Sequence, residues 1–424
     1  MTPRRASRRE TIAFYGHFNA TNFGNEATLE AILQNLRRVR PGVRFICISP
    51  DPSPVMKADD LSFVSISPSF VWSRSPLNPL LRFLYKVCIA TPSEVYRWIK
   101  GFGEIRRADA LIVAGGGLAT DAFGLRASGA GPYYLFKWAL IAKLCRRKLL
   151  FVSVGAGPFY TVLGWALAKS ALSIADFRSY RDDSTRTLLA QMGLRADGDR
   201  IYPDLAFSLC EPATTPDFIA RQGNRPIVGI GLMTDSGRYA SANPNEGVYQ
   251  AYRESLAIFV EWLLAHGYDV KLFVGDLLDD ANVIPEFKQS LASKVAPEDM
   301  DRIVEEPVCS FHDLLEQIAA TDFVVVTRFH NIVFALMCGK PVISLSFHDK
   351  CDALMSAAEL TRYCLPIPEL TPQDLIERFS DLVRAQETIR SRMAGKVQNF
   401  RNALHDQYAV ILNHIFPDRD IRAQ

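Results

Sequence analysis

The chain has 424 residues, of which 48% are hydrophobic and 22% are charged, and its formal net charge is +2. This length exceeds what one ordinary hydrophobic core accommodates, so two domains are expected. A net charge this small does not indicate a nucleic-acid binder, and no nucleic acid is expected among the partners. The eight cysteines are scattered without CxxC pairs, which disfavours a zinc module or a disulfide framework and favours a reducing, cytoplasmic environment.

The start of the chain is rich in arginine, and we interpret residues 1–10 as a disordered basic arm. No apolar segment of signal-peptide length follows it, so secretion is not expected. The uncharged run 149–168 has the length of a membrane helix. Its middle is Gly155-Ala156-Gly157-Pro158, which predicts a strand, a glycine loop and a helix instead.

Short apolar runs alternate with helical patterns through the first half of the chain. They predict strands at 11–15, 43–48, 61–66, 110–114, 149–154 and 176–180. This alternation is typical of a doubly wound parallel sheet, so we assign residues 11–210 to an N-terminal Rossmann-like domain. Residues 68–106 interrupt the alternation as an aromatic insertion. We expect this insertion to be buried and to shape a pocket; peripheral contact with a membrane surface is the alternative.

Residues 211–225 are rich in proline and threonine and are the predicted linker. The alternation then restarts, with strands predicted at 227–233, 270–274, 301–304, 323–326 and 341–346. Residues 226–370 are therefore assigned to a second Rossmann-like domain. The helical patterns in residues 371–424 are expected to pack across both domains.

Arg328 and His330 lie where a predicted strand, Phe323–Val326, ends and a helical pattern begins. Ligands of open α/β sheets bind at this carboxyl edge. A fixed cation and a titratable imidazole suit an anionic ligand and a proton transfer. A surface arginine and a helix-capping histidine are the alternative interpretation.

Three glycines, Gly115, Gly116 and Gly117, follow the predicted strand 110–114. Such a run lets the backbone approach a ligand closely, and its N–H groups can bind an anion. A plain tight turn between strand and helix is the alternative. Neither a GK[ST] sequence nor GxGxxG is present, so the loop is not a Walker or dinucleotide motif.

Together, four segments resemble the polysaccharide pyruvyl transferase family. They are Gly16 with Asn22–Ala27, Gly115–Asp121, Ser179–Asp182 with Pro203-Asp204, and Arg328–Val342 continuing to Lys350. The turn Gly155–Pro158 is also similar to the family's glycine-proline turn. The chain departs from the family at Asn25, where many members carry an acid, so the nearby carboxylate that remains is Glu26.

The resemblance implies two Rossmann-like domains in a GT-B-like arrangement. It also implies a phosphoenolpyruvate-dependent pyruvyltransferase that forms a cyclic pyruvate ketal on two hydroxyls of a sugar. The partners would be phosphoenolpyruvate as co-substrate and a saccharide or lipid-linked oligosaccharide acceptor of polysaccharide or exopolysaccharide biosynthesis. No cofactor and no metal are implied, and the expected location is the cytoplasm or the inner face of the membrane.

The resemblance also suggests roles for individual residues. His330 is expected to be the general acid that protonates the donor methylene carbon. Arg328 and Glu26 are the other two expected catalytic residues. The donor's carboxylate and phosphate need cations and backbone donors. The candidates for donor binding are Arg181, Arg328, Gly115, Gly116, Gly117, Asn22, Asn25 and Lys350. Asp121 is a candidate for acceptor binding and, with Glu26, for the base.

Two other functions remain open on the sequence. A GT-B glycosyltransferase that uses a nucleotide-sugar would share the fold class and an anionic donor. A non-catalytic binding protein of the same fold is the second alternative, motivated by Asn25. The identity of the acceptor sugar and the oligomeric state are not determined by the sequence.

Overall fold

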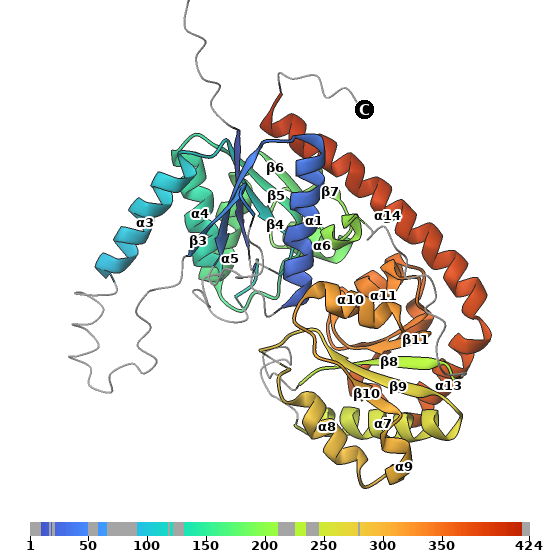
Figure 1. Cartoon of the computed structure of the whole chain (residues 1–424). Coiled ribbons are helices and arrows are strands. Elements are labelled where there is room, and N and C mark those ends of the chain that lie inside the picture. The colour runs from blue at the N-terminus through green and yellow to red at the C-terminus, as the bar shows by residue number, and fades with distance from the viewer. Residues whose placement is uncertain are drawn as a thin grey trace, which may run out of the picture. The chain divides into compact units, whose positions relative to one another are not determined.

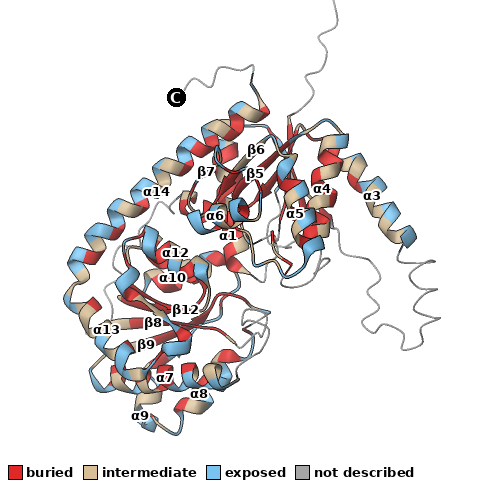
Figure 2. Ribbon diagram, turned by 180° about the vertical axis from the view of Figure 1, so that it is seen from behind, coloured by how far each residue is buried: buried red, intermediate tan, exposed pale blue. Residues whose placement is uncertain are grey.

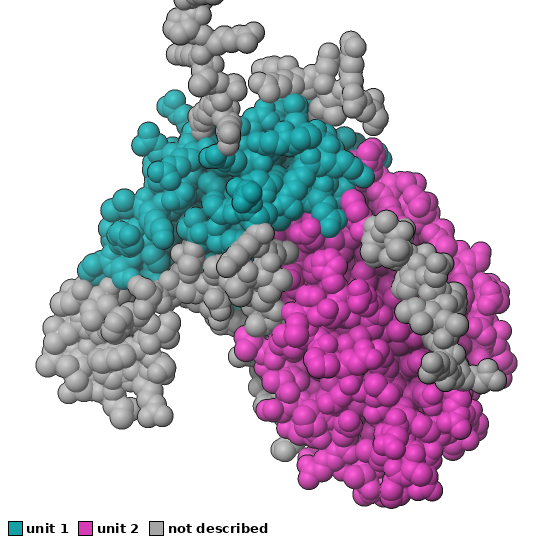
Figure 3. Space-filling model, viewed as in Figure 1, with its two compact units in different colours: residues 1–20, 33–204, 406–424 teal, residues 21–32, 205–405 magenta. Residues whose placement is uncertain are grey.

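The computed structural model divides the chain into two compact units, coloured in Figure 3. Unit 1 comprises residues 1–20, 33–204 and 406–424, and unit 2 comprises residues 21–32 and 205–405. The structure describes residues 10–16, 18, 22–49, 58–65, 91–117, 119–121, 131–210, 225–234, 246–278 and 280–417. The predicted basic arm, most of the aromatic insertion and nearly all of the predicted linker lie outside these described residues.

Unit 1 contains a seven-stranded parallel sheet in the order β3-β2-β1-β4-β5-β6-β7. The strands are β1 (Thr11–Tyr15), β2 (Arg44–Ser49), β3 (Leu61–Ser65), β4 (Ala110–Ala114), β5 (Lys148–Val154), β6 (Phe177–Tyr180) and β7 (Arg200–Ile201). The six strands predicted for this half are confirmed. The strand order reverses between β1 and β4, which is where doubly wound sheets place their ligands.

Helices cover both faces of this sheet, as Figure 1 shows. They are α1 (Phe23–Val39), α3 (Thr91–Ile105), α4 (Pro132–Leu144), α5 (Val162–Ser173), α6 (Asp183–Gln191) and the end of α14 (Gln386–Ile415). Figure 2 shows that the strands of the sheet are largely buried and that the helices have exposed outer faces. The central strands β4 and β5 are apolar along almost their whole length because both of their faces are covered.

Unit 2 contains a six-stranded parallel sheet in the order β10-β9-β8-β11-β12-β13. Its strands are β8 (Ile227–Leu232), β9 (Asp269–Val274), β10 (Ile303–Glu305), β11 (Phe323–Val326), β12 (Val342–Ser346) and β13 (Cys364–Pro366). Its helices are α7 (Glu246–Ala265), α8 (Val283–Leu291), α9 (Pro297–Met300), α10 (Phe311–Ala319), α11 (Phe329–Met337), α12 (Asp349–Ala357), α13 (Pro372–Arg384) and most of α14, with short 3₁₀ turns at Leu205–Ser208, Thr361–Tyr363 and Ile367–Glu369. The second doubly wound sheet predicted from the sequence is therefore confirmed.

Two helices pass from one unit to the other. Helix α1 belongs to unit 2 up to Ile32 and to unit 1 from Leu33, and α14 changes from unit 2 to unit 1 after His405. The domain boundaries expected from the sequence had placed the whole of residues 11–210 in one domain. The structure differs because the start of α1 is bonded to unit 2: Phe23 N donates to Gly275 O at 3.4 Å.

Local signals for helix starts were mostly correct. The pattern Thr371-Pro372-Gln373-Asp374 predicts a helix N-cap at Thr371. The structure confirms it, since the Thr371 side chain accepts from the backbone N–H of Asp374. From the sequence, Asp183 or Ser184 is the expected cap of the helix that follows β6. The structure differs, because Asp182 caps α6 by accepting from Thr185 N. The uncharged run 149–168 forms β5, a glycine loop and α5 as predicted. Within the described part of the chain, no helix is both long enough and apolar enough to cross a membrane.

Candidate active site

Arg328 lies two residues after the end of β11 in unit 2 and is the N-cap residue of α11. Its guanidinium forms a two-point ion pair with the carboxylate of Asp280, with Nε–Oδ2 at 3.0 Å and Nη2–Oδ1 at 2.6 Å. Both residues are buried, and Asp280 also accepts from Thr234 N at 3.0 Å. Burial raises the pKa of Asp280, and the neighbouring guanidinium only partly offsets this. The orientation of Arg328 is therefore fixed by a carboxylate from the loop after β9.

His330 lies in the first turn of α11, and its imidazole ring packs on the backbone of Gly24 in α1. A Cβ atom added at Gly24 would collide with Nδ1 and Cγ of the ring. The ring of Phe329 stands edge-on to the imidazole with 5.1 Å between centroids. Lys350, in the first turn of α12, places its Nζ 6.0 Å from the centroid of that Phe329 ring. Three predicted site elements of unit 2, namely α1, α11 and α12, thus meet around His330 and Phe329.

The start of α1 is attached to unit 2 through Asn22. Its side-chain Oδ1 accepts from Asn25 N at 3.2 Å, and its Nδ2 donates to Asp276 Oδ2 at 2.9 Å. Asn22 was predicted to bind the donor, but its amide is engaged at both ends in holding the helix start. This geometry favours a structural role for Asn22. Asn25 is half-buried in the same turn.

Glu26 is buried in the first turn of α1. Its Oε2 accepts a hydrogen bond from Phe311 N, at the start of α10, at 3.3 Å. Burial raises the pKa of Glu26 to about 7; the Phe311 hydrogen bond opposes this, and Glu30 and Asp313 add to it. A carboxyl group with such a pKa can take up or release a proton near neutral pH. Glu26 therefore has the proton affinity expected of a catalytic base.

The glycine loops of unit 1 follow β4 and β5. Gly115 and Gly116 both have positive φ angles, +62° and +59°. Residues with a Cβ atom rarely adopt this backbone conformation. The two loops are bonded to each other, with Gly155 N donating to Gly116 O at 3.0 Å and Gly157 N to Ala119 O at 2.7 Å. The three predicted donor-binding glycines are thus held in one backbone arrangement at the carboxyl edge of the sheet.

Arg181 directly follows β6 and lies beside these loops. A Cβ atom at Gly155 would fall 3.0 Å from its Nη2, so a larger residue there would press on the guanidinium. The side chain is nearly buried and pairs with Asp204 at 3.5 Å and with Asp182 at 3.7 Å. Burial alone would raise the pKa of Asp182, but the charge of Arg181 and hydrogen bonds from Ser184 and Thr185 lower it. The structure therefore brings Arg181 together with the glycine loops in unit 1.

Asp121 does not have the geometry of a free base. Its carboxylate accepts from Tyr160 N at 2.6 Å, from Thr161 N at 2.8 Å and from the Thr161 hydroxyl. Thr161 is the N-cap residue of α5, so Asp121 fixes the end of one loop to the start of the next helix. These contacts assign Asp121 a structural role and leave Glu26 as the better-supported base of the two.

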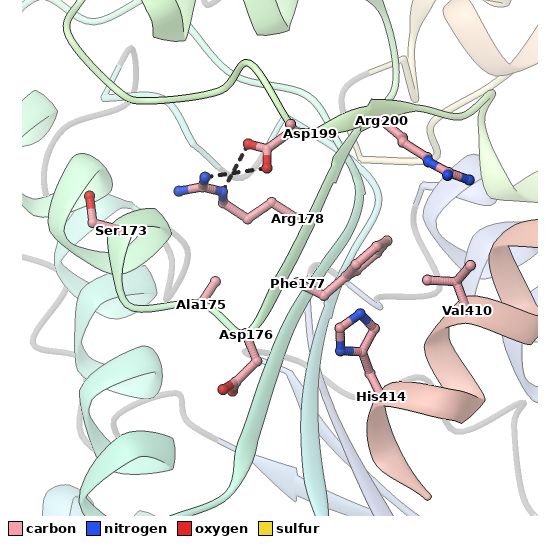
Figure 4. Close-up of a pocket in the computed structure, with 10 residues that line it drawn as sticks. Ser173, Ala175, Asp176, Phe177, Arg178, Asp199, Arg200, Val410 and His414 are labelled. Carbon is pink, nitrogen blue, oxygen red and sulfur yellow. Dashed lines mark hydrogen bonds and ion pairs between the residues drawn. The ribbon is translucent and has the colours of Figure 1, made fainter. Parts of the chain in front are cut away.

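A pocket of about 420 Å³ in unit 1 lies away from these residues (Figure 4). It is lined by Asp176 and Phe177 at the start of β6, whereas Arg181 follows the end of that strand. Inside it Arg178 pairs with Asp199 at 2.9 Å, and His414 contacts the ring of Phe177. The pocket is thus at the amino edge of the sheet, opposite to the glycine loops.

Sequence reasoning missed the residues that fix the cation and the imidazole, Asp280 and Gly24. The acidic run after Gly275 at the exit of β9 was a signal for the first. No local pattern indicates the second, because Gly24 and His330 are far apart in the sequence. Among the residues that the structure describes, no group of three His, Cys, Asp or Glu side chains is placed to hold a metal ion.

The sequence matches the family model of polysaccharide pyruvyl transferases over residues 22–349. The chain belongs to this family. The matched range contains every candidate residue except Lys350, which follows it directly. No curated protein sequence matches the chain.

Solved structures share the two-domain α/β fold of this chain. A UDP-GlcNAc 2-epimerase from Neisseria meningitidis bound to UDP-GlcNAc is 12% identical, with a TM-score of 0.56 and coverage of 96% of this chain and 100% of that one. HepE from Anabaena in complex with UDP is 14% identical (TM-score 0.58, coverage 94% and 100%), and MurG from Acinetobacter baumannii is 12% identical (TM-score 0.51, coverage 95% and 98%). At these identities the likeness concerns the fold alone, and it establishes the GT-B fold.

Proposed function

We propose that the chain transfers a pyruvyl unit from phosphoenolpyruvate to two hydroxyls of a sugar, forming a pyruvate ketal. Membership of the polysaccharide pyruvyl transferase family supports the transfer and the saccharide acceptor. The observation that carries the proposal is the packing of His330 on the helix turn that holds Glu26. This contact puts an imidazole and a carboxyl with a pKa of about 7 in the same unit. Those are the two kinds of proton-transfer group that ketal formation needs.

The chemistry begins with a proton added to the methylene carbon of phosphoenolpyruvate. This step converts the carbon that bears the phosphate into an oxocarbenium-like centre, and we assign the proton to His330. One sugar hydroxyl then bonds to that centre and releases its proton, for which Glu26 is the proposed acceptor. The bond between this carbon and the phosphate oxygen then breaks. The second sugar hydroxyl bonds to the same carbon, closes the ring and releases its own proton. The products are a ketal with a new methyl group and inorganic phosphate.

The donor carries a carboxylate and a phosphate, and the proposed binding groups are cations. In unit 2 they are Arg328, whose fork is oriented by Asp280, and Lys350. Unit 1 carries a separate set of candidate anion-binding groups, Arg181 and the backbone N–H groups of the glycine loop Gly115–Gly117. A planar guanidinium binds either anion with two hydrogen bonds, which a lysine cannot do.

The acceptor proposed is a sugar of a polysaccharide, of an exopolysaccharide, or of a lipid-linked precursor in the cytoplasm. A first test incubates the protein with phosphoenolpyruvate and a panel of galactosides, mannosides and glucosides. The expected result is phosphate release that depends on the acceptor, with mass spectrometry showing one pyruvate ketal per product. Absence of phosphate release with every acceptor class, including lipid-linked sugars, would remove the proposal.

Thermal shift separates this function from a nucleotide-sugar glycosyltransferase of the same fold. Ligands that bind only the folded protein raise its melting temperature by mass action. Phosphoenolpyruvate is expected to stabilise the protein more than UDP- or GDP-sugars at equal concentration. Stabilisation by a nucleotide-sugar alone would favour the glycosyltransferase, and stabilisation without any turnover would favour a binding protein.

A further inference from the structure

Three helices of unit 1 lie side by side with their starts at the same end, as Figure 1 shows for α3, α4 and α5. Glu94 near the start of α3 accepts from Lys137 Nζ and from the Tyr133 hydroxyl of α4, both at 2.8 Å. Helices α4 and α5 follow β4 and β5 directly, so their starts lie at the carboxyl edge of the sheet. The first turns of all three helices therefore border the edge that carries the glycine loops.

The inner face of α3 is fixed against α4. Lys137 is buried, and its Nζ lies 5.7 Å from the ring centroids of Trp98, Tyr134 and Trp138. Gly101 lets the two helices approach closely, since a Cβ atom there would fall 2.8 Å from the Trp138 ring. The orientation of α3, and with it the direction of its outer face, is thus set by a buried ion pair inside an aromatic cluster.

The outer face of α3 is apolar where a surface helix is normally polar. Val95, Tyr96 and Ile99 recur at helical spacing and expose between 52% and 66% of their surface. The start of α5 repeats the pattern: Tyr160, Val162 and Leu163 expose between 55% and 86%. These six side chains form what we call the apolar rim of unit 1.

The charges around the rim suit a lipid surface with anionic headgroups. In α3 the two acidic residues are in ion pairs, Glu94 with Arg97 and Lys137 and Glu104 with Arg107, and Lys100 follows Ile99 on the exposed stripe. Helix α5 contains Lys169 and no acidic residue. Aromatic and branched aliphatic side chains beside lysines are the composition of helices that lie in a membrane interface. The high exposure of Val162 indicates that its side chain protrudes from the surface. A protruding side chain inserts between lipid headgroups more readily than it packs in a flat interface with another protein.

The rim is also continuous with the candidate site. Asp121, which ends the loop that begins at Gly115, accepts hydrogen bonds from the backbone of Tyr160 and Thr161. We propose that the apolar rim docks unit 1 on an anionic phospholipid surface, with the glycine loops next to the headgroups. From the sequence, membrane contact was only the alternative for the insertion 68–106. Three of the rim residues, those of α3, lie in that insertion, and the other three lie at the start of α5. Docking of the rim on a lipid surface does not depend on the reaction proposed above.

The test is flotation of the full chain with vesicles of phosphatidylcholine containing phosphatidylglycerol. The wild type is expected to float with these vesicles and to bind pure phosphatidylcholine vesicles less. The paired variants Val162→Gln/Leu163→Gln and Val95→Gln/Ile99→Gln are each expected to lower the partition constant by roughly tenfold or more. All four positions are exposed, so the melting temperature of both variants should remain close to wild type.

Leu144→Gln is the matched control for Leu163→Gln. Leu144 is 58% exposed, against 55% for Leu163, but it ends α4 at the opposite edge of the sheet. Its replacement should leave vesicle binding unchanged. The proposal is overturned if the wild type does not bind the anionic vesicles, or if the control loses binding as much as Leu163→Gln does. It is also overturned if the rim variants break a dimer seen without lipid and leave vesicle binding intact, because the rim would then contact a second copy.

Discussion

His330 and Gly24 are in direct contact, and the backbone of the glycine determines where the imidazole ring lies. Any side chain at position 24 would occupy the space of Nδ1 and Cγ. The contact joins the start of α1, which carries Glu26, to the start of α11. The residues that we propose as proton donor and proton acceptor, His330 and Glu26, are therefore both carried by helices that meet at this close approach in unit 2.

Replacing Gly24 with alanine should reduce turnover by at least about tenfold, because the imidazole must move from its position. In an ordinary helix this change stabilises the protein by up to about 1 kcal/mol. Gly395→Ala is the control, since Gly395 lies in α14 with nothing within 4 Å of its added Cβ atom. Steady-state phosphate release and melting temperature are measured for both. Full activity of Gly24→Ala would show that the position of the ring is unimportant.

His330→Gln should lower the turnover rate by about 10²–10⁴-fold, the usual loss when a general acid is removed. The affinity for phosphoenolpyruvate, measured by calorimetry, should change only a few-fold, because binding is assigned to the cations. The melting temperature should stay near that of the wild type. Near-normal turnover combined with a lowered melting temperature would instead make His330 a structural residue.

Glu26→Gln should change how stability depends on pH. Burial raises the pKa of Glu26 from 4.5 to about 7, so between these values the folded protein binds more protons than the unfolded chain. This contribution to stability is complete below pH 4.5 and is lost as the pH rises through 7. Glutamine can still accept the hydrogen bond from Phe311, so relative to wild type the variant should gain stability between pH 5 and pH 8. Urea denaturation at both pH values measures this difference; an equal difference at the two would contradict it.

The same substitution tests the catalytic role. If Glu26 is the base, wild-type kcat/KM should rise with pH through about 7, and that limb should be absent from the residual activity of Glu26→Gln. A rate loss without any change in the pH profile would point to a positioning role.

The sequence predicted what local patterns determine. Apolar runs gave the strands of both sheets, and the segment Thr327–Leu336 was correctly placed at a strand-to-helix junction. The patterns could not show that α1 changes units at Ile32, because a continuous helical period contains no sign of which core each turn joins. They also could not show that Asn22 is bonded to Asp276 and Asp121 to Thr161, since these partners come from loops distant in the sequence.

Arg328→Lys should weaken the binding of phosphoenolpyruvate although it keeps the charge. The structure adds a second effect, because a lysine cannot replace both hydrogen bonds to the buried Asp280. A stability loss of roughly 1–3 kcal/mol is expected together with the weaker donor binding.

Asp280→Asn tests whether donor binding depends on the orientation of the Arg328 guanidinium as well as on its charge. This variant keeps Arg328 but removes the carboxylate that holds it, so the KM for phosphoenolpyruvate should rise with a smaller change in kcat. An unchanged KM in both the Asp280→Asn and Arg328→Lys variants would mean that the ion pair is purely structural.

Asp121→Asn tests whether Asp121 holds the start of α5 or binds the acceptor sugar. The carboxylate accepts three hydrogen bonds from Tyr160 and Thr161, and an asparagine would turn an N–H group toward one or more of these donors. We expect a loss of about 1–3 kcal/mol in the free energy of unfolding. Below the melting temperature of the variant, kcat and the KM for the sugar should stay within a few-fold of wild type. Asp197→Asn, at an exposed position of unit 1, is the control for removing a charge. Either of two results would contradict the structural role and indicate that Asp121 takes part in the reaction. One is a large fall in kcat with an unchanged melting temperature, and the other is a rise in the sugar KM alone.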